Sequence, residues 1–351
     1  MNRIFISGYG AVSPAGWGAA ALSQALATGQ PLPIQPLARP GWEQPLRIRP
    51  VPAPAVRPAF LAHPRLRRSS PLTHYAAGAL LESLAPLPAD PRRRVGLILC
   101  LQSGCVDYSH RFFAEVLADP ATASPLLFPE TVFAAPASHL AALLDNTPLV
   151  TTLLGDPATF AQGLRLGADW LGQDRVDLAV VIGTEEINWL RADALWHLEH
   201  TAIMSGGAGA VALCRTPEFS TGVELAVVPR PHSYSARTSR RQAARALRHD
   251  FTPLPNELLC DGLGESPRTN APELAAWGDW PGPRLSLKKM LGEGLMAAAA
   301  WQCVAACAAV AEKKAPAALV SLVGCNQQAA GVRFQAVADA TAAFSDLLRR
   351  E

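Results

Sequence analysis

The feature that most constrains the fold is a series of short, continuous apolar runs separated by stretches with helical periodicity. Two of these runs, RVGLILCL at 94–101 and VDLAVVIG at 176–183, have the length of a strand. Strands that are buried on both faces have continuous apolar runs instead of an alternating pattern. Chains in which such strands alternate with helices form layered α/β folds. The sequence therefore predicts an α/β fold.

The remaining elements are predicted in the same way. We expect helices at 71–87, 136–144, 158–171, 238–248 and 294–311, and one that contains Phe112, Phe113 and Val116. Further strands are predicted at 2–9, 149–154, 207–213, 223–228, 257–260, 317–324 and 331–337. Ten prolines between 31 and 64 predict an extended connection over the surface.

The length and composition limit the domain organisation and the partners. With 351 residues, 49% of them hydrophobic, the chain predicts two domains or two fused halves, which we place at 1–216 and 217–351. A net charge of +2 argues against a general nucleic-acid binder, because such proteins carry a large basic excess.

The cysteines and the apolar segments predict a cytoplasmic protein. Seven cysteines are scattered, without a CxxC pair or a His/Cys cluster at metal-ligand spacing, which is typical of reduced thiols. We expect no metal and no cofactor. The N-terminus lacks the pattern of a signal peptide, and the apolar stretch 295–310 is shorter than the roughly 20 residues of a membrane span. A buried helix is predicted there instead, with Cys303 and Cys307 as packing residues.

Five segments in chain order carry a resemblance to a known family. They are ISGYGAVSPAG at 6–16, SPLLFPETVFAAPASHLA at 124–141, GGAGAVAL at 206–213, LKKMLGEGLMAAAA at 287–300 and LVGCN at 322–326. In this order they resemble the β-ketoacyl synthases. The resemblance implies a thiolase-like fold, with two similar halves in an α-β-α-β-α arrangement. It also implies a decarboxylative condensation by one cysteine and two histidines, with a lysine that orders one histidine.

The resemblance places other residues at those catalytic positions. The cysteine position falls on Pro157, or on Asp156 with a slip of one residue, within LLGDPATFAQG. The first histidine position falls on Asp261 in LCDGLG, and the second on Glu293, whereas the lysine is retained as Lys288. No cysteine lies between Cys105 and Cys214, and no histidine follows His249, so the loss does not depend on the alignment.

Two interpretations of Asp261 and Glu293 follow. Ionised carboxylates accept hydrogen bonds and cannot donate them, and they repel a developing enolate. We therefore expect them to fill space and to pair with Lys288, Lys289 or Arg268; the alternative is a carboxylate pair for general acid/base work. For Asp156 and Pro157 the structural interpretation is a helix N-cap followed by proline at the first helical position.

Surface segments give further candidates. Arg237, Arg240, Arg241, Arg245 and Arg248 form either a solvated face or a docking face for an acidic acyl carrier protein, and Arg92–Arg94 is a weaker candidate. Phe112, Phe113 and the segment 128–133 are candidates for an acyl tunnel, a dimer seam or ordinary core. His139 is predicted to be a core or interface residue.

Together these features predict a non-catalytic partner subunit. The resemblance implies a chain-length factor that forms a heterodimer with an active ketosynthase in type II polyketide or fatty-acid-like synthesis, including aryl polyene systems. Strand 149–154 and helix 136–144 are the predicted seam. The alternatives are a divergent malonyl-carrier-protein decarboxylase or acyltransferase that uses Asp261, Glu293 and Lys288, and a homodimeric scaffold. On its own the chain is therefore predicted not to be an enzyme.

Overall fold

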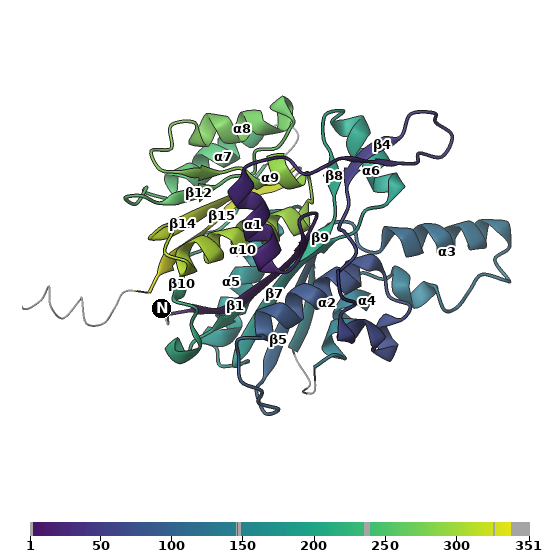
Figure 1. Ribbon diagram of the computed structural model, residues 1–351, viewed down its shortest axis with the longest axis horizontal. Helices are drawn as coiled ribbons and strands as arrows, with labels where there is room; N and C mark the ends of the chain where they lie inside the picture. The colour runs from purple at the N-terminus through teal and green to yellow at the C-terminus, as the bar shows by residue number, and fades with distance from the viewer. Residues whose placement is uncertain (1–2, 145, 147–148, 235–238, 326, 338–351) are drawn as a thin grey trace, which may run out of the picture.

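A mixed sheet forms the centre of the molecule (Figure 1). The computed structural model describes residues 3–144, 146, 149–234, 239–325 and 327–337. The strand order is β13-β12-β14-β15-β10-β1-β9-β7-β5-β6. These strands are β1 (Phe5–Ser13), β5 (Val95–Leu101), β6 (Leu149–Leu154), β7 (Leu178–Glu185), β9 (Gly207–Cys214), β10 (Val223–Val227), β12 (Leu258–Cys260), β13 (Arg284–Leu285), β14 (Ala317–Val323) and β15 (Gln328–Ala336).

The pairing directions of the sheet repeat. From β1 outward, β9 and β7 are added antiparallel, and β5 and β6 are added parallel. From β10 outward, β15 and β14 are added antiparallel, and β12 and β13 are added parallel. Antiparallel pairing of β1 with β10 joins the two sets. The sheet is thus built from two similar five-stranded halves, as the predicted fold class requires. The predicted domain boundary between 216 and 217 lies between β9 and β10 and stays a prediction.

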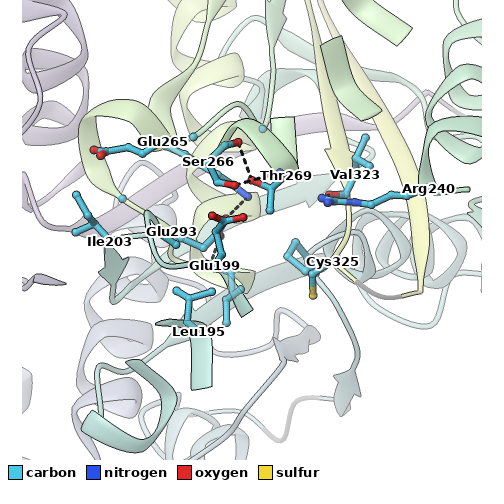
Figure 2. Close-up of a pocket in the computed structure, with 17 residues that line it drawn as sticks. Leu195, Glu199, Ile203, Arg240, Glu265, Ser266, Thr269, Glu293, Val323 and Cys325 are labelled. Carbon is cyan, nitrogen blue, oxygen red and sulfur yellow. Dashed lines mark hydrogen bonds and ion pairs between the residues drawn. The ribbon is translucent and has the colours of Figure 1, made fainter. Parts of the chain in front are cut away.

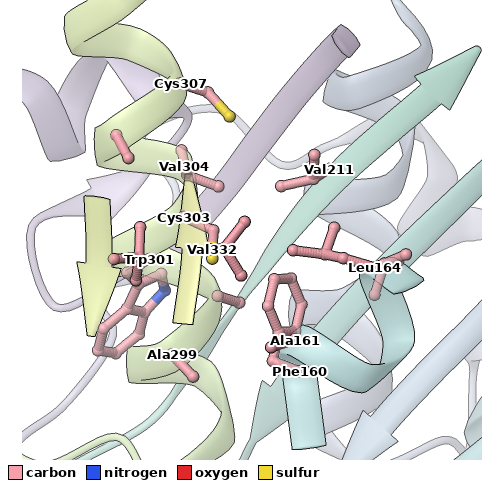
Figure 3. Close-up of a cluster of buried hydrophobic side chains, with 14 of the residues drawn as sticks. Phe160, Ala161, Leu164, Val211, Ala299, Trp301, Cys303, Val304, Cys307 and Val332 are labelled. Atoms are coloured by element: carbon pink, nitrogen blue, oxygen red, sulfur yellow. The ribbon is translucent and has the colours of Figure 1, made fainter. Parts of the chain in front are cut away.

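Helices cover both faces of each half. The helices α5 (Thr159–Gly172) and α10 (Met296–Ala311) share one core cluster with side chains from both halves of the sheet (Figure 3). The outer face of the first half packs against α2 (Pro71–Leu84) and α4 (Ala135–Ala141), and that of the second half against α7 (Arg240–His249) and α8 (Pro267–Trp277). The layers therefore run α-β-α-β-α.

Small residues let α10 lie close to the sheet. All its residues except Ala309 and Ala311 are buried, so the predicted buried helix is confirmed. A Cβ atom on Gly209 would lie 2.8 Å from the Cβ of Ala300, which is closer than carbon atoms pack. The indole N–H of Trp301 donates to the carbonyl oxygens of Val12 and Ala208. In the part of the chain that the structure describes, no helix is long and apolar enough to span a membrane.

Several elements differ from the predicted ones. The proline-rich segment 31–64 is more than an extended connection: it holds β3 (Gln35–Leu37) and β4 (Leu46–Arg49), and β4 pairs with β8 (Met204–Ser205). The helices α6 (Trp189–Leu198), α8 and α9 (Leu287–Leu291) were not predicted. The helix α8 begins at Pro267 and contains Pro272, a residue that normally breaks helices, so its sequence carries little helical signal.

One side of the molecule exposes an apolar surface. The strand β6 is the last strand of the sheet order. The helix α3 (Val106–Ala118) protrudes from the molecule without a buried residue (Figure 1). The short helix η3 (Phe128–Thr131) packs on α3, and α4 contacts both η3 and β6. We call the exposed apolar residues of this region the edge face: Phe113, Leu117, Leu126, Phe128, Val132, Phe133, Val150 and Leu154.

Candidate functional site

A cavity lies between α6, the start of α8, the turn before α10 and the end of β14 (Figure 2). Its lining residues are Pro157, Leu195, Glu199, Ala202, Ile203, Arg240, Gly262, Gly264, Glu265, Ser266, Thr269, Lys288, Gly292, Glu293, Leu295, Val323 and Cys325. Three of the predicted positions, Pro157, Lys288 and Glu293, therefore line one cavity. Pro157 is far in the sequence from the segment that holds Lys288 and Glu293.

An ion pair between Lys288 and Glu293 forms part of the cavity wall. The Nζ atom of Lys288 lies 2.9 Å from Oε2 of Glu293, and Oε1 accepts the backbone N–H of Leu295 at 2.8 Å. The backbone of Glu293 is held in turn, because its N–H donates to the carbonyl oxygen of Ile203 at 2.8 Å. The predicted pairing of Glu293 with a lysine is confirmed. Since a carboxylate only accepts hydrogen bonds, this position offers no donor to a ligand.

Asp261 points away from the cavity. Its side chain is fully buried, and its Oδ2 atom receives hydrogen bonds from Nε and Nη2 of Arg284 at 3.1 and 2.9 Å. Its other oxygen accepts the backbone N–H of Leu263. The predicted partners Lys288, Lys289 and Arg268 are therefore wrong for Asp261, because β13 places Arg284 beside β12 in the parallel pair. Asp261 and Glu293 do not form a carboxylate pair in the cavity.

A second buried carboxyl lies behind the same loop. Glu273 on α8 is 3% exposed, and its Oε1 accepts the backbone N–H of Gly262 at 2.9 Å. Burial, with the nearby charge of Asp261 as the second cause, raises the pKa of Glu273 to about 7. No sequence pattern pointed to Glu273, because α8 itself was not predicted.

The start of α5 holds no cysteine. The carboxylate of Asp156 accepts the N–H of Ala158 at 3.2 Å, and its carbonyl oxygen accepts the N–H of Thr159 at 2.8 Å. The prediction of Asp156 as N-cap and Pro157 as first helical residue is therefore wrong, because α5 begins at Thr159 and its N-cap is Ala158. At the predicted cysteine position the cavity is lined by a proline ring, which has no heteroatom that could attack a thioester.

Cys325 also lines the cavity, although the sequence analysis did not single it out. Its Sγ atom accepts a hydrogen bond from Nε2 of Gln102 at 3.5 Å. The residue is exposed on the connection between β14 and β15, but burial of its thiol and the nearby carboxylates of Asp156 and Glu293 raise the pKa of this thiol. Since the thiolate is the reactive form, Cys325 is a poor nucleophile at neutral pH.

The arginines of the predicted docking face have different surroundings. Arg240 lines the cavity and donates to the carbonyl oxygen of Val323 at 3.1 Å. Arg248 lies over the rings of Trp277 and Trp280, with Cζ 5.3 and 5.5 Å from their centroids. Arg237 lies outside the described residues. Arg241 and Arg245 are exposed, so the outward part of the predicted face is smaller than the sequence suggested.

The other surface candidates also have defined surroundings. Arg94 forms an ion pair with Asp177 at 2.6 Å and Arg92 one with Asp90 at 3.7 Å, and both arginines are exposed. Phe112 packs on Phe128, with ring centroids 5.5 Å apart. His139 is paired with Glu130 at 2.9 Å.

The cavity thus supports binding better than covalent chemistry. Two of its charged groups, Lys288 and Glu293, pair with each other, and the described residues contain no group of three or more His, Cys, Asp or Glu side chains that could hold a metal. Cys303 and Cys307 pack in the core as predicted.

Comparison with solved structures places the fold in the thiolase-like class of the ketosynthases. The ishigamide ketosynthase/chain length factor has a TM-score of 0.82 at 16% identity, over 96% of this chain and 100% of that chain. A β-ketoacyl synthase from Burkholderia phymatum STM815 gives the same values. The ketosynthase ApeO in complex with its chain length factor ApeC, from Xenorhabdus doucetiae, has a TM-score of 0.76 at 15% identity, over 96% and 98% of the two chains.

Sequence comparison gives no closer assignment. No family model matches the chain, and no curated protein matches it. At the identities of the solved structures, the likeness establishes the fold.

Proposed function

We propose that this chain is a non-catalytic ketosynthase-like subunit, a chain-length factor that forms a heterodimer with an active ketosynthase. The observation that carries the proposal is the content of the cavity. Pro157 lines it where the resemblance expects a cysteine, and the Lys288–Glu293 ion pair occupies the wall where it expects a histidine. A thioester needs a nucleophilic atom, and an enolate needs hydrogen-bond donors. Pro157 has no nucleophilic atom, and the carboxylate of Glu293 offers no hydrogen-bond donor.

The edge face supports a subunit that works in a pair. Single exposed apolar side chains are ordinary, but a contiguous group beside an unpaired edge strand is typical of an interface. The predicted seam of β6 and α4 belongs to this region, and α3 extends it. Two of the structurally similar proteins are described as a ketosynthase/chain length factor and as a ketosynthase in complex with its chain length factor. By this proposal the active partner carries the acyl chain, and the edge face contributes to the wall of its tunnel.

The setting proposed is type II polyketide or fatty-acid-like synthesis, including aryl polyene systems, with an acyl carrier protein as the further partner. Arg241 and Arg245 remain the outward residues of the proposed carrier docking face. One similar structure is described as an acyl-carrier protein in complex with its type II polyketide ketosynthase.

Co-expression tests the proposal. The full chain is produced with a ketosynthase encoded in its gene neighbourhood, and the product is measured by size-exclusion chromatography with light scattering. We expect a one-to-one heterodimer in which labelled acyl groups load only onto the partner. A stable homodimer that ignores the ketosynthase would instead favour the scaffold function. Release of carbon dioxide from malonyl-carrier protein by the chain alone would favour the decarboxylase.

A further inference from the structure

The carboxylate of Asp156 is buried without a cation. The residue is 1% exposed, and the ion pairs formed by the described residues do not include it. A buried carboxylate without compensation is strongly unfavourable, so its charge must be balanced by other groups. The balance comes from N–H groups.

Four N–H donors surround this carboxylate. Oδ2 accepts the backbone N–H groups of Gln327 and Gln328 at 3.0 and 3.2 Å. Oδ1 accepts the backbone N–H of Ala158 at 3.2 Å and faces the side-chain Nε2 of Gln328 at 3.5 Å. Ala158 lies in the turn before α5, in the first half of the fold. Gln327 and Gln328 lie at the start of β15, in the second half.

Contacts other than Asp156 also orient the side-chain donor of Gln328. The amide of Gln328, itself 8% exposed, is oriented by Gln162, whose Nε2 donates to its Oε1, and by Thr159, whose Oγ1 accepts from its Nε2 at 3.2 Å. Gly324 leaves the necessary room, because a Cβ atom there would lie 1.8 Å from Oδ2 of Asp156. The donors therefore form a preorganised pocket, and the carboxylate fits into it as a ligand would.

We propose that this pocket is an anion-binding site for small carboxylates, and that Asp156 is its permanent internal ligand. Convergent backbone N–H groups near the start of a helix bind anions in many proteins. Here the chain supplies the anion itself. Because Asp156 occupies the donors next to Pro157 in the cavity wall, they are not available to the oxygen of any molecule in the cavity. The proposal holds whether or not the chain pairs with a ketosynthase.

Removal of the internal ligand tests the proposal by chemical rescue. The variant Asp156→Gly deletes the carboxylate and leaves its space vacant, whereas Asp156→Asn keeps the space filled and is the matched control. The melting temperature of each full-length variant is measured in sodium formate and in sodium chloride at equal ionic strength. We expect a saturable rise with formate for Asp156→Gly that is several times the rise with chloride. The wild type and Asp156→Asn should respond equally to both salts.

The outcomes decide the proposal in either direction. Equal responses of Asp156→Gly to formate and chloride would overturn it. If this variant does not fold in ordinary buffer, denatured protein is diluted into formate or chloride, and the recovery of soluble, helical protein is compared. Recovery in formate well above that in chloride supports the site, and equal recovery, including none in either salt, contradicts it.

Discussion

At the scale of single residues, carboxyl groups near the cavity differ in what surrounds them. Glu293 is paired with a lysine, Asp261 with an arginine, and Asp156 with amide N–H groups, whereas Glu273 has hydrogen bonds but no cation in contact. An unpaired buried carboxyl holds its proton to higher pH. Of these four carboxyl groups, Glu273 has a raised pKa.

Glu273 should make the protein less stable as the pH rises through neutrality. Burial raises its pKa from the usual 4.5 to about 7, so between these values the folded chain keeps a proton that the unfolded chain has released. The free energy of unfolding should fall across this range, by on the order of 3 kcal/mol for Glu273 alone. In Glu273→Gln this component should disappear. Urea unfolding at several pH values between about 5 and 8 measures it, and parallel curves for the two proteins would contradict the prediction.

Asp261 should be needed for stability. Replacement by alanine leaves the guanidinium of Arg284, only 25% exposed, without its carboxylate. We expect a loss of about 2–3 kcal/mol, below the value for a fully buried pair because Arg284 reaches solvent. Chemical denaturation gives the value. The control is Asp177→Ala, which removes a carboxylate from the more exposed pair with Arg94 and should cost about 1 kcal/mol or less. Equal losses in both variants would show that burial does not set the cost.

The residue scale also marks the limit of prediction from sequence. The order of the five segments that resemble the β-ketoacyl synthases located Pro157, Lys288 and Glu293, and all three line the cavity. Cys325 and Arg240 also line it, but their positions depend on how β14 and α7 fold back, which no local pattern encodes. The partner of Asp261 was missed for the same reason, because the β12–β13 pairing brings Arg284 there.

At the scale of elements, long and strongly apolar segments were predictable and short ones were not. The strands β5 and β7 and the helix α10 have continuous apolar sequences that their burial explains. By contrast, β4 and β8 exist only because each pairs with a distant segment. The protruding helix α3 was predicted from its periodicity, but its lack of buried residues was not, since the same side chains suit a core or an interface.

Because α10 packs closely on the sheet, we expect alanine to destabilise the protein at Gly209 but not at Gly172. In Gly209→Ala the new methyl group meets Ala300 at 2.8 Å, so the helix or strand must move, at a cost of about 1–3 kcal/mol. In Gly172→Ala, at the end of α5, no atom lies within 4 Å, and the gain in helix propensity should leave stability unchanged or raise it by about 0.5–1 kcal/mol. Thermal unfolding distinguishes the two. A milder effect at Gly209 than at Gly172 is the outcome that would refute the packing argument.

The proposed heterodimer should depend on the edge strand β6. Val150→Lys and Leu154→Lys place charges on exposed apolar positions of β6, so the fold should survive while the proposed heterodimer dissociates. A weakening of about tenfold or more is expected for the pair of substitutions. The matched control is Leu274→Lys, an exposed leucine on α8 outside the edge face. Analytical ultracentrifugation of the co-expressed subunits reports the loss, and an unchanged complex would place the interface elsewhere.

At the scale of the whole molecule, the two halves share one core. Phe160 and Val211 from the first half pack in the same cluster as Cys303 and Val332 from the second (Figure 3). The sequence suggested two units, but it could not show that the helices of both lie in one common layer. The two halves are therefore similar in structure, but we do not expect them to fold independently.

A split chain tests this interdependence. The fragments 1–216 and 217–351, produced separately, should be insoluble or partly unfolded, because each exposes its side of the shared core. Produced together, they should assemble into a complex with native-like circular dichroism. A well-folded monomer of either fragment alone would show that the proposed boundary separates autonomous domains.

The central position of β1 has a consequence for synthesis. This strand leaves the ribosome before its two long-range neighbours, β9, which ends at Cys214, and β10, which begins at Val223. At about 5–20 residues per second, the nascent chain carries an apolar strand without partners for on the order of 10 s or more. Such distant pairing slows folding. The order of the strands in the sheet thus leaves β1 without its long-range partners until β9 and β10 have been synthesised.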